Sequence, residues 1–170
     1  MPSSAKLTTQ ELTQLGVLLA VAIVLRIAEN FFPYLLPLPG ARLGLANILT
    51  IFVLINYGTN KAGLFLCTRI LLVGILSTGL FTPGFLIGLG GAALSFVFMS
   101  IAVERNWFSP IGIGLLGAFM HNCGQIIMAV YLLNSIAVFS YLPLLIAIGI
   151  PTGLFTGTLA NILLKRIKTT

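Results

Sequence analysis

Gly117-Ala-Phe-Met-His-Asn-Cys-Gly-Gln125 is the stretch around which the rest of the chain is best interpreted. It interrupts a hydrophobic run from Ile111 to Leu133 and places the only histidine, His121, about midway along that run. On a helix, Gln125 lies four residues from His121 and three from Asn122, so the three polar side chains share roughly one face. Unpaired polar groups in hydrocarbon cost several kcal/mol each, so this face should turn toward protein, trapped water or a ligand. The stretch is therefore a candidate site.

The composition of the chain is that of an integral membrane protein. Of its 170 residues, 58% are hydrophobic and 7% are charged, whereas soluble domains carry about 25% charged residues. The length allows about six spans of roughly 20 residues and no separate soluble domain. We therefore expect an all-α membrane protein: one domain, residues 1–170, in the form of a compact bundle of six transmembrane helices. The expected spans are about 12–32, 43–57, 62–78, 85–103, 110–133 and 141–164.

The basic residues predict the orientation of this bundle. The formal net charge is +6, but the basic side chains are single and gather at the ends of the spans, so we expect no nucleic-acid partner. Six crossings place Lys6, Lys61, Arg105, Lys165, Arg166 and Lys168 on one face of the membrane. Arg42 is the only basic residue near the opposite loops. By the positive-inside rule both termini are cytoplasmic, in a multi-pass cell-membrane protein whose first span is retained.

Several charged residues fall within or beside the spans. Arg26 and Glu29 are spaced to pair on one helix, and Arg69 lies near the middle of its span, where an arginine costs about 2.5–3.5 kcal/mol. With Arg42, three positive charges face one negative charge, so an anion would complete the balance. Guanidinium groups suit carboxylate or phosphate recognition. We predict an outward-facing pocket for a small anionic molecule, lined by Arg26, Glu29, Arg42, Asn47, Arg69, His121, Asn122 and Gln125.

Structural alternatives stand beside these assignments. Arg26 with Glu29 would also serve as a simple ion pair, Arg42 would reach lipid headgroups, and Arg69 would bond to backbone carbonyls. The polar face around His121 would equally form a network between helices. Gly149, Gly153 and Gly157 recur at every fourth position and indicate close helix packing. Gly16 and Ala20 form a small-xxx-small pattern that fits either ordinary packing or a partner surface.

The absence of aspartate argues against an enzyme. The only acidic residues are Glu11, Glu29 and Glu104, whereas Mg²⁺-dependent prenyl-diphosphate chemistry needs several carboxylates. His121 has no nearby nucleophile or acidic partner, so no catalytic triad is expected. Cys67 and Cys123 lie in apolar runs, where cysteine behaves as a small hydrophobe. We therefore expect no metal site, no cofactor and no disulfide.

Three features of the sequence resemble a known family. Gly40-Ala-Arg-Leu-Gly-Leu-Ala-Asn47, Arg69 and the stretch Gly117–Gln125 are similar to the Gx transporter family, also labelled heptaprenyl diphosphate synthase component I. The likeness runs from about Leu12 to Leu164, and its motifs occur in the right order. That family in turn is similar to the substrate-binding S components of energy-coupling factor transporters, which are bundles of six membrane helices.

The resemblance implies a bacterial cytoplasmic-membrane protein with an extracytoplasmic substrate pocket. It also implies assembly with an energy-coupling transmembrane subunit and two cytosolic ATPases. S components dock through an Ala-xxx-Ala pattern on the first helix, which Gly16 and Ala20 match with one small-residue departure. Two hypotheses result: an uptake component that binds a small anionic molecule, or a non-catalytic membrane subunit associated with heptaprenyl diphosphate and quinone biosynthesis.

Overall fold

The structure, a computed structural model, describes residues 8–29 and 44–167. These residues form six α-helices and two short helical segments, and no strand occurs among them. The prediction of an all-α fold with six helices is confirmed. The helices are α1 (Thr9–Glu29), α2 (Leu45–Tyr57), α3 (Thr59–Val73), α4 (Pro83–Glu104), α5 (Pro110–Leu133) and α6 (Leu142–Ile167); a π-helix, η1 (Gly74–Thr78), continues α3, and a 3-10 helix, η2 (Ile136–Tyr141), precedes α6.

Short polar residues set where three of the helices begin. Thr8 and Glu11 form a capping box at the start of α1: the Thr8 hydroxyl accepts from the Glu11 amide at 3.2 Å, and the Glu11 carboxylate accepts from the Thr8 amide at 3.1 Å. Thr82 caps α4 and Ser109 caps α5, and each is followed by proline at the first helical position. These caps satisfy amides that the helix leaves free, and α1 begins at Thr9, directly after its cap.

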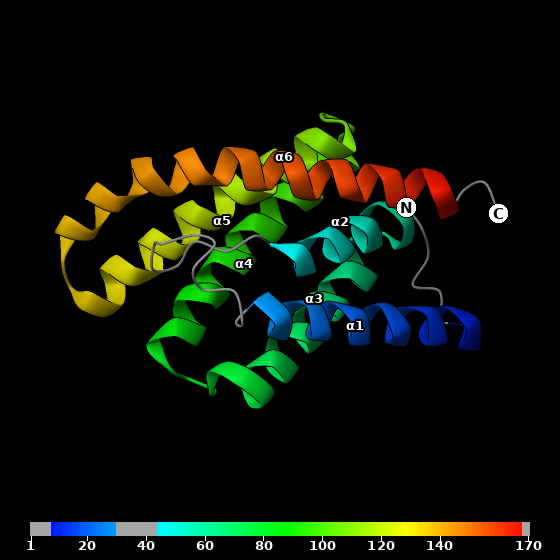
Figure 1. Cartoon of the computed structure of the whole chain (residues 1–170), viewed down its shortest axis with the longest axis horizontal. Helices are drawn as coiled ribbons and strands as arrows, with labels where there is room; N and C mark the ends of the chain where they lie inside the picture. The colour runs from blue at the N-terminus through cyan, green and yellow to red at the C-terminus, as the bar shows by residue number, and fades with distance from the viewer. Residues whose placement is uncertain (1–7, 30–43, 168–170) are drawn as a thin grey trace.

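Helix α2 is the core of the bundle. Eight of its residues are buried, including the consecutive run 48–54, and in Figure 1 it lies among the other helices. A helix that is apolar all round is stable only when protein or lipid covers every side. Its 13 residues extend about 20 Å, which is shorter than the ~30 Å hydrocarbon layer. Neighbouring helices therefore provide most of its surroundings.

Five helical stretches are long and apolar enough to cross a membrane: α1, α3 together with η1, α4, α5, and α6 together with η2. Large apolar side chains are exposed on each of them, among them Val24 on α1, Leu64 on α3, Val97 on α4, Ile127 on α5 and Ile150 on α6. A soluble protein rarely exposes so much contiguous apolar surface. In a bilayer the same surface contacts lipid, and the chain is a multi-pass membrane protein.

Glycines bring α4, α5 and α6 into backbone contact. A Cβ atom built on Gly124 of α5 would lie 2.5 Å from the Gly90 carbonyl oxygen of α4. A Cβ atom on Gly157 of α6 would lie 2.7 Å from the Ile111 carbonyl oxygen of α5. Gly149 and Gly153 face α5 in the same way, so the prediction that this glycine series packs helices together is confirmed.

The start of α1 and the end of α6 lie at the same end of the bundle, on the right in Figure 1. At this end Lys61 donates to Glu11 at 2.6 Å, and the Thr59 hydroxyl donates to Glu104 at 2.6 Å, which joins α1, α3 and α4. The connections at the opposite end, residues 74–82 and 134–141, contain no charged residue. The described charges outside the spans therefore gather at one end.

Candidate functional site

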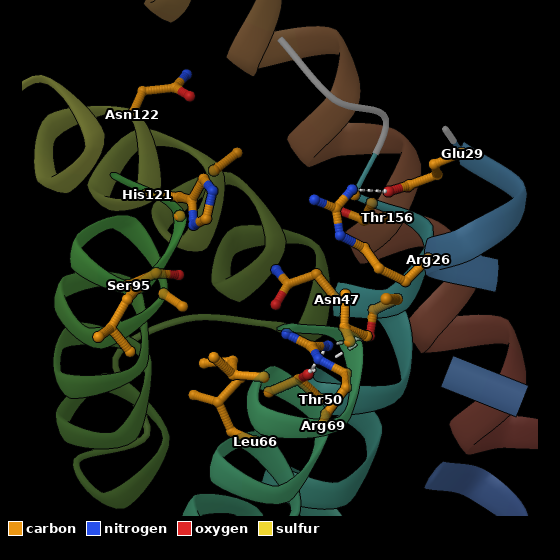
Figure 2. Close-up of a pocket in the computed structure, with 18 of the residues that line it drawn as sticks. Arg26, Glu29, Asn47, Thr50, Leu66, Arg69, Ser95, His121, Asn122 and Thr156 are labelled. Atoms are coloured by element: carbon orange, nitrogen blue, oxygen red, sulfur yellow. Dashed lines mark hydrogen bonds and ion pairs between the residues drawn. The ribbon is translucent and has the colours of Figure 1, made fainter. Parts of the chain in front are cut away.

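A cavity of about 150 Å³ lies inside the bundle, and all six α-helices contribute to its wall (Figure 2). It is built from the last turn of α1, the first turns of α2, the second half of α3, the stretch of α4 from Gly84 to Met99, and the middle of α5 and α6. It therefore occupies the half of the bundle away from the charged end. The polar residues in its wall are Arg26, Glu29, Asn47, Thr50, Arg69, Ser95, His121, Asn122, Thr152 and Thr156.

Arg26 and Glu29 form an ion pair beside the N-terminus of α2. The Arg26 Nη1 donates to Glu29 Oε2 at 3.0 Å, and the two side chains are only 13% and 6% exposed. The other Glu29 oxygen accepts from the Leu45 amide, the first of α2, at 2.5 Å. A carboxylate at a helix N-terminus is favourable because the free amides carry partial positive charge. Glu29 thus holds α1 and α2 together while it balances the charge of Arg26.

Arg69 is anchored to α2 by neutral groups. Its Nη1 donates to the Ala46 carbonyl oxygen at 2.6 Å and to the Thr50 hydroxyl at 2.7 Å. Both bonds use the same nitrogen, and no carboxylate of the described residues pairs with this guanidinium. Arg69 therefore combines a fixed position with a charge that has no counter-ion among residues 8–29 and 44–167.

Asn47 and His121 complete the polar side of the cavity. Figure 2 shows the Asn47 amide between the guanidinium groups of Arg26 and Arg69, with the His121 ring facing the same space from α5. No hydrogen bond joins the Asn47 side chain to any other described residue, although this side chain is only partly exposed. An amide in an apolar bundle is stable when it has a partner, so Asn47 has donor and acceptor capacity for a bound molecule.

The polar face of α5 is divided between two neighbouring helices. Asn122 lines the edge of the cavity, but its Nδ2 donates to the Leu145 carbonyl oxygen of α6 at 2.7 Å. Gln125 does not line the cavity: it is 5% exposed, and its side chain packs against Gly91 of α4, where the absence of a Cβ leaves room for it. Gln125 thus belongs to the contact between α4 and α5.

The remaining predicted positions lie elsewhere. Gly16 and Ala20 are exposed on the outer face of α1, and a Cβ atom built on Gly16 would meet nothing within 4 Å. Their docking role stays a prediction. Arg42 lies outside the described residues.

Four hydroxyl residues of the cavity wall were not anticipated from the sequence: Thr50, Ser95, Thr152 and Thr156. Thr50 accepts from Arg69, Ser95 donates to the Gly117 carbonyl oxygen at 2.9 Å, and Thr156 is buried opposite Gly44. A single hydroxyl in an apolar helix is too common to mark a site. Thr50 nevertheless lies three residues after Asn47, so helical periodicity alone places it on the same side of α2.

The cavity has a polar and an apolar side. Its apolar wall comes from α3 and α4, with Leu66, Ile70, Val73, Phe85, Leu89, Ala92 and Met99. Among the described lining residues, Arg26 and Arg69 are basic and Glu29 is acidic, which leaves one excess positive charge when His121 is neutral. Within the described part of the chain, no three potential metal-ligating side chains lie together. The arrangement suits an anion with an apolar portion more than it suits a metal ion.

Comparison with known proteins gave one family. A family model described as heptaprenyl diphosphate synthase component I matches residues 18–163. Neither the curated proteins nor the solved structures contain a match.

Proposed function

The chain belongs to the heptaprenyl diphosphate synthase component I family, and from this premise we propose that it is a membrane transport component that binds a small anionic molecule. The observation that carries the proposal is the convergence of Arg26, Arg69 and Asn47 on one cavity inside the bundle. Intramembrane arginines are costly, and a ligand that uses their charge gives a reason for their presence. The proposal fits an uptake component similar to the S components.

We propose that the cavity faces the outside of a bacterial cytoplasmic membrane. The start of α1 and the end of α6 lie at the same end of the bundle in Figure 1. Lys61 pairs there with Glu11 of α1, and Lys165 and Arg166 lie in the last turn of α6. Positive loops favour the cytoplasmic side. The cavity lies in the other half of the bundle. A substrate would therefore enter from outside and leave toward the cytoplasm when partner subunits supply energy.

The exposed outer face of α1 is the surface we propose for an energy-coupling transmembrane subunit. Gly16 and Ala20 are exposed there, and a Cβ atom built on Gly16 would meet nothing within 4 Å. Small residues allow a second backbone to approach closely. Replacement of Gly16 by leucine should reduce co-purification of a coupling subunit with the chain and leave the cavity unaltered.

The binding proposal is tested with the purified protein. Small molecules released by denaturation are identified by mass spectrometry for the wild-type protein, for Arg69→Met and for the exposed control Arg105→Gln. We expect an anionic compound that is retained by the wild type and the control and lost from Arg69→Met. Equal retention by all three proteins would refute binding at Arg69.

A second candidate function is favoured by the description of the family. Under it, the chain is a non-catalytic membrane subunit of a prenyl diphosphate synthase, and the polar residues hold helices together. Its lack of aspartate supports a non-catalytic role, because diphosphate chemistry with Mg²⁺ requires carboxylates. This candidate predicts that the chain co-purifies with a soluble synthase and increases the amount of product that the synthase makes. An Arg69→Met protein that still folds should give the same co-purification and the same increase.

A further inference from the structure

One edge of the Arg69 guanidinium is the feature of the cavity that can bind an anion. Both bonds to Ala46 and Thr50 leave from Nη1, which has two hydrogen atoms. Within residues 8–29 and 44–167, no hydrogen bond uses Nε or Nη2, which form a pair of donors on one edge of the guanidinium. Two parallel N–H groups in this geometry match two oxygens of a carboxylate or of a phosphate.

The charges of the cavity distinguish between these two kinds of anion. Glu29 already balances Arg26 at 3.0 Å, so of the described lining residues only Arg69 has an uncompensated charge. One negative charge on the ligand makes this set neutral. A second negative charge would stay unpaired in an apolar bundle, where burial of an isolated charge is strongly unfavourable. The set therefore favours a singly charged head over a phosphate monoester or a diphosphate.

The rest of the ligand is defined by the apolar wall and by the available volume. Leu66, Val73, Phe85 and Met99 line the side that comes from α3 and α4. An engineered apolar cavity of about 150 Å³ in another protein holds benzene, so a cavity of this volume takes a hydrocarbon body on the order of six carbons.

We propose that the ligand is a small monocarboxylate, held by the edge of Arg69 that carries Nε and Nη2, with a compact apolar body against α3 and α4. This inference rests on the proposed binding function and specifies its substrate class. The Asn47 amide lies beside Arg69 and supplies a further hydrogen bond to the head group.

Gly88 provides a test that does not disturb the charged residues. It lines the cavity, and a Cβ atom built on it would meet nothing within 4 Å, unlike one on Gly91, which would lie 2.8 Å from the His121 carbonyl oxygen. Gly88→Leu therefore fills the cavity and leaves the helix contacts intact. Arg69→Lys keeps the charge but removes the paired donors.

The experiment measures thermal unfolding of the full chain in lipid nanodiscs at pH 7.5 with benzoate, phenyl phosphate or benzylamine, three probes with the same apolar body. We expect benzoate to stabilise the wild type at a concentration about tenfold lower than phenyl phosphate does, and benzylamine to have no effect. Arg69→Lys should weaken benzoate about tenfold, Gly88→Leu should abolish its effect, and Arg105→Gln should leave it unchanged.

The outcomes separate this inference from the proposed function. Stronger stabilisation by phenyl phosphate would overturn the carboxylate assignment and leave an anion-binding cavity in place. Failure of benzoate to stabilise the wild type, or an undiminished benzoate effect in Gly88→Leu, would overturn the inference, while the retained-ligand experiment judges the proposed function separately. If Arg69→Lys does not fold, the Gly88→Leu protein decides the result.

Discussion

Replacement of Glu29 by glutamine should separate the structural and the ligand-binding contributions of the charged cavity. The substitution removes the negative charge that lies 3.0 Å from Arg26 and keeps an oxygen that accepts from the Leu45 amide. Arg26 then remains 13% exposed with no counter-ion among the described residues. Removal of one partner from a buried pair costs about 3–5 kcal/mol, and the lost charge at the α2 N-terminus adds about 0.3–1 kcal/mol. We expect Glu29→Gln to lower the free energy of unfolding by about 3–4 kcal/mol. This value is at the lower end of the summed costs because Arg26 lines the cavity, where water would solvate its charge.

The measurement is equilibrium unfolding in mixed micelles for a double-mutant cycle. Arg26→Gln/Glu29→Gln removes both charges, so it should be more stable than Glu29→Gln alone, with a coupling free energy of about 2–3 kcal/mol. Glu29→Gln also raises the positive charge of the cavity by one. An anionic ligand should therefore stabilise this variant more than it stabilises the wild type. A loss below about 1 kcal/mol, or additive effects in the double variant, would refute the reasoning.

Three further predictions address packing and orientation. Gly124→Ala should lower the free energy of unfolding by about 1–3 kcal/mol, because the new Cβ would lie 2.5 Å from the Gly90 carbonyl oxygen. Gly16→Ala is the control in the same unfolding assay: its Cβ meets open space, so the variant should be as stable as the wild type or up to ~1 kcal/mol more stable. Asn122→Ala should lower the free energy of unfolding by about 1 kcal/mol, because it removes the 2.7 Å hydrogen bond from Asn122 Nδ2 to the Leu145 carbonyl oxygen of α6. An unchanged unfolding midpoint would contradict a stabilising role of that bond. In a background without Cys67 and Cys123, Asn60→Cys at the charged end should react with a membrane-impermeant thiol reagent only in inverted vesicles; reaction in intact cells would reverse the proposed orientation.

Much of the fold follows from local features of the sequence. Apolar runs of about 20 residues predict the long helices, and the spacing of Arg26 and Glu29 predicts their ion pair, which is confirmed at 3.0 Å. Glycines at every fourth position, Gly149, Gly153 and Gly157, predict close helix packing along α6. These features depend on neighbours along one helix, so periodicity is sufficient to find them.

The arrangement of the site depends on contacts between helices, which periodicity does not define. The sequence places Gln125 on one face with His121, but Gly91 on α4 leaves a space that Gln125 fills, while Asn122 bonds to α6. Arg69 bonds to a backbone carbonyl, as one alternative anticipated, yet it also lies in the cavity wall. The structural role of this arginine is therefore compatible with the proposed binding role, because Nη1 makes the bonds to α2 and no hydrogen bond of the described residues uses Nε or Nη2.

The central claim is that the polar groups of the bundle surround a positively charged chamber that opens to the outside. Ala92→Cys, in the background without Cys67 and Cys123, places a thiol in the cavity wall. The measurement is its rate of reaction in intact cells with an anionic and a cationic thiosulfonate of similar size, both unable to cross the membrane. We expect the thiol to react from outside, faster with the anionic reagent than with the cationic one, and we expect this reaction to be lost when Gly88→Leu fills the chamber. No reaction from outside, or a faster reaction with the cationic reagent, would contradict the claim.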